Sequence, residues 1–116
     1  MLFNKTKKAK IIGRVRIADS FFKRFRGLMF ERARNFSYAL VFPLEKEGRL
    51  EASIHMLFVF FPIDVLWLDA RKRVVDKRTA LKPFALNATP KKAAVFIVEL
   101  PKGKAKKIEI NDLLEW

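Results

Sequence analysis

The chain has 116 residues, 51% of them apolar, so it is long enough for one domain with a substantial core and too apolar for a disordered chain. It contains no cysteine, which excludes disulfide bonds, thiolate metal sites and cysteine nucleophiles. Its net charge of +13 is uneven: residues 1–34 carry eleven Lys and Arg residues against Asp19 and Glu31. Such a basic pole attracts anionic partners, namely nucleic acid, phosphorylated ligands or acidic proteins; the alternative is a surface that only keeps the protein in solution.

The first ten residues, MLFNKTKKAK, are basic and lack the apolar segment of a secretory signal. We therefore expect a cytoplasmic protein without a membrane partner, and we assume a monomer. Residues 1–10 are expected to be a basic segment that is able to stay disordered, and residues 11–116 a single mainly β domain. The absence of glutamine and the 32% of charged residues are typical of a thermophile.

Along the chain, residues 11–18 alternate apolar and basic side chains, which predicts a strand. Asp19 and Ser20 are N-cap candidates and Gly27 suits a helix C-cap, so a short helix is expected over residues 20–26. Residues 38–42 are expected to form a strand that ends at Pro43, followed by a turn over residues 44–49.

Residues 50–61 contain the most apolar run of the chain, and we expect a long strand that is buried on both faces and ends at Pro62. A membrane helix needs about 20 apolar residues, whereas residues 54–68 are fifteen and already include His55, Pro62 and Asp64. The remaining predicted strands are residues 64–69, 73–76, 93–100 and 104–110, with a long connection over residues 77–92. The prediction is a mainly β fold, a compact barrel or sandwich of about six to eight strands with one short helix.

Four segments in this order carry a resemblance to a known family. They are IADSFFKRFRGLM (residues 17–29), ALVF (39–42), HMLFVFFPIDVLWLD (55–69) and VELPKG (98–103). They are similar to the motifs A-x-T-x-x-x-R-x-x-GLM, G-M-L-F, F-W-M-K-N-T-x-x-PLD-x-x-F-x-D and L-E-L-P-A-G of the family of domains of unknown function number 192. The resemblance implies a compact mainly β fold and no particular activity.

Two departures from that family pattern bear on function. Aligned on Pro62 and Asp64, the chain has Phe58 and Val59 where the family has an adjacent Asn and Thr, which implies an altered or lost site if that pair lines one. Asn111 also stands where many members have glycine before an aspartate.

Four residues are candidates for ligand binding. His55 titrates near neutrality and is a possible acid, base or ligand, although a lone histidine in an apolar strand more often packs in a core. Asp64 is expected to accept backbone hydrogen bonds or to pair with Arg26, and Glu99 has the same ambiguity. Arg24 and Arg26, beside Gly27, are able to clamp a phosphate or carboxylate, or else to lie on a solvated helix face.

The sequence predicts neither a metal site nor a cofactor, and no catalytic residue can be assigned. A nucleic-acid backbone could follow the basic pole, and Phe21 or Phe22 could stack on bases. We favour a non-catalytic binding domain for an anionic partner; the alternative is an enzyme or small-ligand binder with a pocket near His55, Arg24, Arg26 and Asp64. The candidate residues of the basic face are Lys5, Lys7, Lys8, Lys10, Arg14, Arg16, Lys23, Arg32 and Arg34.

Overall fold

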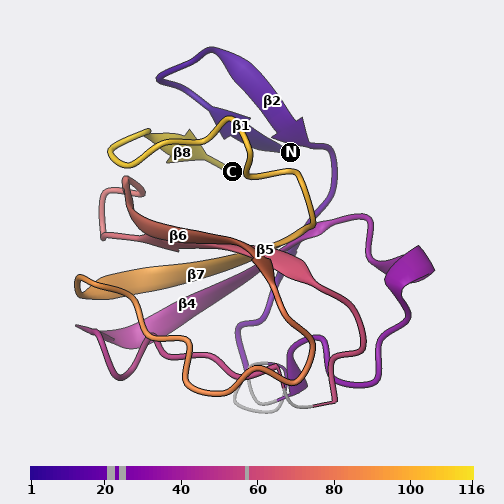
Figure 1. Ribbon diagram of the computed structural model, residues 1–116. Coiled ribbons are helices and arrows are strands. Elements are labelled where there is room, and N and C mark those ends of the chain that lie inside the picture. The colour runs from indigo at the N-terminus through magenta and orange to yellow at the C-terminus, as the bar shows by residue number, and fades with distance from the viewer. Residues whose placement is uncertain (21–22, 24–25, 57) are drawn as a thin grey trace.

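The computed structural model describes residues 1–116 except 21–22, 24–25 and 57, and its described part has eight strands in two sheets (Figure 1). The predicted mainly β class is confirmed, with a sandwich-like arrangement and no closed barrel. The strands are β1 (Leu2–Asn4), β2 (Ala9–Ile12), β3 (Val15–Ile17), β4 (Ala39–Gly48), β5 (Ile63–Leu68), β6 (Val74–Leu81), β7 (Ala94–Pro101) and β8 (Leu114–Glu115), and a 3₁₀ helix, η1, spans Ala33–Asn35. No helix formed by the described residues has the length and hydrophobicity of a membrane span.

The larger sheet has the strand order β3-β4-β7-β5-β6, and apart from the parallel β3–β4 pair its neighbours are antiparallel. Its central strands are covered on both faces, which is why β5 is buried at every residue. One face packs against the three-stranded sheet β2-β1-β8, and loops cover the other (Figure 1). We call these the sheet-covered and the loop-covered face.

The N-terminal ten residues contain β1 and the start of β2. Asn4 Nδ2 and Lys7 Nζ donate to Asp112 Oδ2 at 2.8 and 2.6 Å, and the Glu109 N–H donates to the same oxygen at 2.9 Å. Burial by itself would raise the pKa of Asp112, but these three donors hold it below its ordinary value. The N-terminal strands are therefore fastened to the C-terminal segment.

The predicted strand over residues 50–61 is wrong. The described residues 50–56 and 58–61 form a loop. The Trp67 indole N–H, which donates to the Ala52 carbonyl at 2.7 Å, and an isolated bridge between Ile54 and Ala88 hold this loop in place. Met56 is buried whereas Phe60 is 59% exposed. A continuous apolar run has no period, so it could not reveal which residues face outward. The centre of the sheet is β7 instead.

Smaller differences concern where elements end. β4 continues through Pro43 to Gly48, with an irregular register between these two residues. The predicted strand over residues 11–18 is divided into β2 and β3, β6 extends to Leu81, and residues 104–110 form turns. Strands that lie in a sheet are extended by their neighbours' hydrogen bonds, which local sequence does not show.

Of the helix predicted over residues 20–26, residues 21–22 and 24–25 lie outside the described residues. On either side of them, Ser20 Oγ accepts a hydrogen bond from the Lys23 N–H at 3.1 Å, and the Gly27 N–H donates to the Lys23 carbonyl at 2.9 Å. Gly27 has a φ of 50°, in the left-handed region. These contacts agree with the predicted cap roles of Ser20 and Gly27.

The departure from the family pattern at position 111, asparagine in place of glycine, has a backbone explanation. The φ of Asn111 is 77°, in the left-handed region, which asparagine tolerates better than most residues. We expect Asn111→Val to lower the free energy of unfolding by about 1–2 kcal/mol, and Asn111→Gly to leave it unchanged or raise it slightly. Guanidinium melts would measure both, with the exposed Lys106→Val as control. Equal effects of valine and glycine at position 111 would contradict this prediction.

Candidate ligand-binding site

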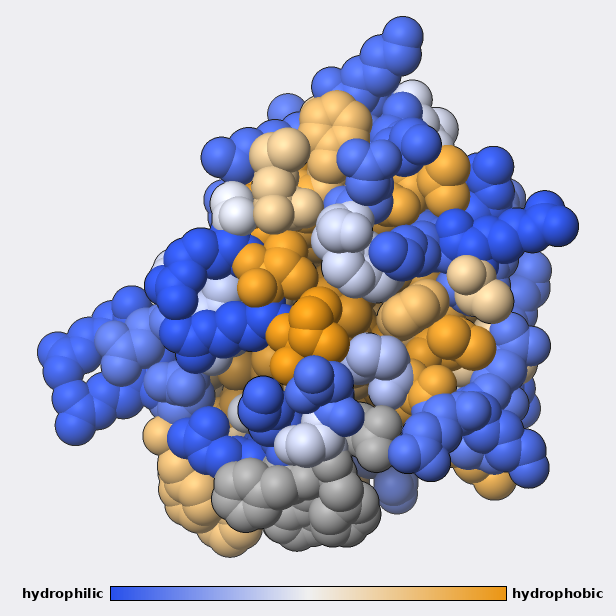
Figure 2. All heavy atoms as spheres, turned by 180° about the vertical axis from the view of Figure 1, so that it is seen from behind, coloured by the Kyte–Doolittle hydropathy of each residue, from blue (hydrophilic) through white to orange (hydrophobic). Residues whose placement is uncertain are grey.

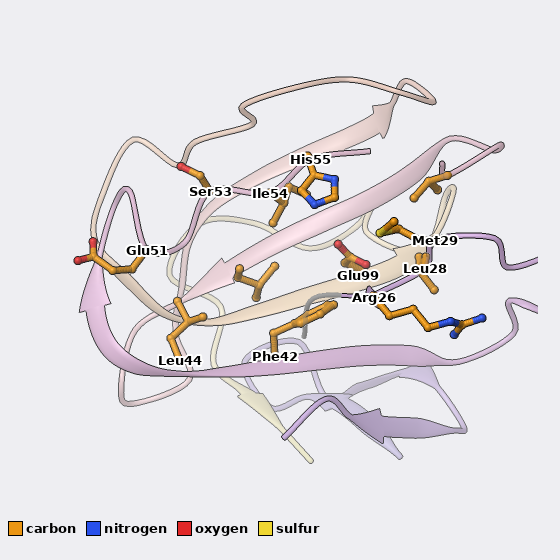
Figure 3. A pocket seen from close by; sticks show the side chains of 13 residues that line it. Arg26, Leu28, Met29, Phe42, Leu44, Glu51, Ser53, Ile54, His55 and Glu99 are labelled. Atoms are coloured by element: carbon orange, nitrogen blue, oxygen red, sulfur yellow. The ribbon is translucent and has the colours of Figure 1, made fainter. Parts of the chain in front are cut away.

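A cavity of about 300 Å³, here called the Glu99 cavity, lies on the loop-covered face of the larger sheet (Figure 3). Strands β4 and β7 supply its floor, and the segments around residues 26–29 and 51–59 supply its walls. Its apolar lining includes Leu28, Met29, Phe42, Leu44, Ile54 and Ile97. Among the described residues, its polar lining includes Arg26, Glu51, Ser53, His55 and Glu99. A mostly apolar cavity with a few polar groups is the usual form of a small-molecule site.

Glu99 is the most unusual of these groups. It lies in the middle of β7 between Leu40 of β4 and Val65 of β5, and it is only 6% exposed. Burial raises its pKa to about 8. Glu99 therefore carries a proton at neutral pH and offers an O–H donor to the cavity.

His55 lies in the loop that covers this cavity and is exposed, in contrast to the buried strand position that we predicted. Figure 3 shows Glu99 between His55 on one side and Arg26 on the other. The loop turns that overturned the strand prediction are what place His55 at the cavity.

A second cavity, of about 540 Å³ and here called the Arg16 cavity, adjoins the first because Arg26 and Gly27 line both. Arg16 and Lys23 are its other cationic residues. The Arg16 guanidinium lies over the Tyr38 ring, 4.2 Å from its centroid.

Tyr38 and Glu31 complete the polar lining of the Arg16 cavity. The Tyr38 hydroxyl donates to Glu31 Oε2 at 3.5 Å. Burial, together with the Glu31 charge, raises the pKa of Tyr38, so the hydroxyl stays a donor. One carboxylate thus faces three cations among the residues described around this cavity.

Asp64 does not join His55 and Arg26. It lies at the start of β5 on the opposite, sheet-covered side and is fully buried. Its Oδ1 accepts the Ala80 N–H at 2.9 Å, and its Oδ2 accepts those of Gly103 and Ala105 at 2.9 and 3.0 Å. Acceptance of backbone hydrogen bonds is one of the two roles that the sequence predicted for Asp64. It places Asp64 away from the Glu99 cavity. Arg24 lies outside the described residues.

The residues expected to form a basic face lie in separate parts of the fold. The lysines at positions 5–10 belong to the β1–β2 hairpin, and Arg32 and Arg34 lie at η1, on another side of the molecule (Figure 1). Several are engaged with carboxylates: Lys5 with Glu115, Lys7 with Asp112 and Glu109, and Lys23 with Asp19. Arg14 and Arg16 lie against the Tyr38 ring.

Four exposed phenylalanines gather beside the loops, although Phe21 and Phe22, the rings predicted to stack, lie outside the described residues. Phe30 stacks on Phe58 at 4.9 Å, and Phe84 meets Phe60 edge-on at 5.2 Å. Phe58 has a φ of 55°, a conformation that suits the asparagine found there in the resembled family. On the face turned away from Figure 1, apolar side chains also reach the surface between hydrophilic ones (Figure 2).

The sequence pattern marks Glu99 as a carboxylate in an apolar strand without predicting a binding role, and it assigns Arg16 only to a general basic face. The available signal for Glu99 was a carboxylate inside the apolar run AAVFIVEL. Among the described residues, no group of three or more His, Cys, Asp or Glu side chains could hold a metal ion.

The fold and the cavities define a small mainly β sandwich-like protein with adjoining pockets on the loop-covered face. The chain belongs to the DUF192 family, described as "Uncharacterized ACR", whose model matches residues 2–116.

Similar proteins come from thermophilic archaea. The chain is 49% identical over 118 aligned positions to UPF0127 protein TK1120 of Thermococcus kodakarensis, covering all of this chain and 73% of that protein. It is 46% identical to UPF0127 protein PF1050 of Pyrococcus furiosus, covering 99% of this chain and 97% of that one. These relatives agree with the predicted thermophile-like composition.

Two crystal structures share the fold at 19% identity. A protein of unknown function from Novosphingobium aromaticivorans superposes with a TM-score of 0.78, covering 88% of this chain and 74% of that one. A protein from Sinorhizobium meliloti, proposed to be a transcription regulator, superposes with a TM-score of 0.80, covering 98% and 88%. At this identity the likeness concerns the fold alone.

Proposed function

We propose that this protein is a non-catalytic binding protein for a small anionic ligand, which it holds in the Arg16 cavity. The observation that carries the proposal is the meeting of Arg16 of β3 with Lys23 and Arg26, which are three residues apart in the chain, on one cavity of about 540 Å³. Cationic side chains around a concave site favour phosphate and carboxylate groups.

The arrangement of Arg16 supports this proposal. Its guanidinium lies on the Tyr38 ring, which holds the planar group in place and leaves its N–H edges for a ligand. The net charge of +13 would also raise the local concentration of anions around the site. We place the protein in the cytoplasm as a monomer as part of the same proposal.

A small ligand fits the structure better than a nucleic acid does. The predicted basic residues are divided between the β1–β2 hairpin, η1 and the Arg16 cavity, and three of the lysines face carboxylates. A nucleic-acid backbone needs a continuous basic track.

An enzyme that uses the Glu99 cavity is the second candidate function, because His55, Arg26 and a protonated Glu99 line one cavity. Arg26 lines both cavities and would contribute to either candidate function, whereas Arg16 would contribute only to anion binding. Turnover of a bound ligand would separate the two, since a binding protein returns its ligand unchanged.

Thermal-shift and calorimetric titrations with orthophosphate, a sugar phosphate and a nucleoside monophosphate test the proposed function. We expect at least one to raise the melting temperature, and Arg16→Gln to weaken its binding about tenfold or more. Arg34→Gln on η1, outside both cavities, is the matched control and should bind normally. Equal losses in both variants, or the absence of any stabilising anion, would refute the Arg16 cavity as the site. If a single-stranded oligonucleotide binds and both substitutions weaken its binding equally, the result would instead support a nucleic-acid partner.

A further inference from the structure

The turn that follows β7 carries lysines that the predicted basic face does not include. They are Lys102, Lys104, Lys106 and Lys107. The turn has a defined backbone, because the N–H groups of Lys104, Lys106 and Ile108 donate to carbonyls three residues earlier at 3.1, 3.3 and 3.1 Å. Its lysines therefore project from fixed positions.

A cavity of about 410 Å³, here called the lysine groove, lies between this turn and the β1–β2 hairpin. In Figure 1 the segment that follows β7 rises toward that hairpin. The hairpin contributes Lys7 and Lys10 to the groove, and the turn contributes Lys104, Lys106 and Lys107. A second cavity, of about 390 Å³, adjoins the groove because Gly103 and Lys106 line both, and it adds Lys77 and Lys102. Two segments far apart in the sequence thus bring their lysines to one place.

Most of these ammonium groups are available to a ligand. Lys7 contacts Asp112 and Glu109 at 2.6 and 3.0 Å, and Lys77 donates to two backbone carbonyls of the turn. The other lysines form no ion pair with a carboxylate of the described residues; they are Lys10, Lys102, Lys104, Lys106 and Lys107. Asp64 borders the second cavity, but it is fully buried and already accepts three backbone N–H groups.

The residue types of the groove select the ligand. Among the described residues, neither an arginine nor an aromatic ring lines the groove or the cavity that adjoins it. Nucleobases would find no ring to stack on, and a planar carboxylate would find no guanidinium fork. A lysine ammonium group is a compact point charge that suits phosphate oxygens, and its methylene stem lines the wall while the charge stays at the rim. A row of such charges favours a ligand whose own charges follow one another along a chain.

We propose that the lysine groove binds a linear oligophosphate, whose phosphate groups lie along the rim against Lys10, Lys104, Lys106 and Lys107. The site recognises the ligand by its chain of charges. It is separate from the Arg16 cavity, so it goes beyond the proposed function and does not depend on it.

Calorimetric titration of the Arg16→Gln variant with inorganic tripolyphosphate tests this proposal, because that variant has lost a main cation of the other candidate anion site. We expect the variant still to bind tripolyphosphate, with an affinity that falls steeply between about 50 and about 300 mM salt. Orthophosphate, which has a single phosphate group, should bind the same variant about tenfold more weakly or less.

Two pairs of substitutions in the Arg16→Gln variant locate the binding. Adding Lys104→Gln and Lys106→Gln should weaken tripolyphosphate binding about tenfold or more. Adding Lys82→Gln and Lys92→Gln instead removes the same charge from exposed positions outside the described lining of both cavities, and it should leave the affinity nearly unchanged.

The outcomes separate this proposal from the proposed function. Tripolyphosphate binding that disappears in Arg16→Gln would overturn the lysine groove and leave the proposed function standing. Equal losses in the two lysine pairs would show that net charge alone attracts the ligand, and would also overturn the groove. Tighter binding of an oligothymidylate of about ten nucleotides, lost with Lys104 and Lys106, would replace the oligophosphate by a nucleic acid. If tripolyphosphate binds through the groove while no anion binds through Arg16, the proposed function fails and the lysine groove stands.

Discussion

Replacing Glu99 with glutamine is expected to raise the free energy of unfolding above pH 8 by on the order of 5 kcal/mol. The carboxyl has a pKa of about 8 in the folded protein against an ordinary value of 4.5, because burial between Leu40 and Val65 disfavours its charged form. Glutamine keeps the shape and polarity of the neutral acid and removes the ionisation.

The sign of the pH dependence follows from proton binding. Between about pH 4.5 and 8 the folded state holds the Glu99 proton that the unfolded chain has released, so unfolding becomes easier as the pH rises. The contribution of Glu99 is fully present below its unfolded pKa. It declines by about 1.4 kcal/mol per pH unit and is lost once the pH passes the folded pKa.

Guanidinium melts of both proteins from about pH 4 to about pH 9.5 would measure this dependence. The difference between them should be small at the acidic end and largest above pH 8. Glu47→Gln on the exposed part of β4 controls for the loss of one negative charge. A difference between Glu99→Gln and the unsubstituted protein that does not vary with pH would show that Glu99 ionises normally in the folded state.

Removing the carboxylate of Asp64 should be the most destabilising single change in the described backbone network, with a cost of about 3–5 kcal/mol for Asp64→Ala. Its two oxygens accept the N–H groups of Ala80, Gly103 and Ala105, which would be left in a buried site without these acceptors. Asp64→Asn should cost less, because one oxygen remains.

Chemical denaturation at neutral pH would compare these variants. Asp19→Ala is the matched control, since Asp19 is an exposed aspartate whose contact is a solvent-accessible pair with Lys23 at 3.5 Å, and we expect it to change stability by less than about 1 kcal/mol. Ligand binding in a folded Asp64→Asn variant should be unchanged. A selective loss of ligand affinity in that variant would return Asp64 to the binding site.

The sequence was most informative where side-chain type and local geometry agree. Residues 64–69 and 93–100 were predicted as strands and form β5 and β7. Each is a short run of β-branched and apolar residues that ends at a turn. The capping roles of Ser20 and Gly27 were also predictable, because they depend on the residue types at those positions. The family was also readable, since its motifs follow one another across most of the chain.

The candidate site was only partly predictable. Arg26 and His55 were named together and do line one cavity, whereas Asp64, named with them, faces the other side of the sheet. Adjacent residues of a strand point to opposite faces of the sheet. A difference of one position along a strand therefore decides whether a carboxylate faces the cavity. Asp64 shares its face with Leu66, and Glu99 shares the other face with Ile97.

By itself, the sequence determined a mainly β domain with a basic surface, its family, and the residue types available for binding. Only the tertiary structure decided that the described residues 50–56 and 58–61 form a loop, that His55 reaches a cavity, and that Glu99 is buried in the middle of β7. The physical reason is that burial and strand order depend on contacts between distant segments. β7 lies between β4 and β5 although both precede it in the chain, and that placement gives Glu99 its proton at neutral pH.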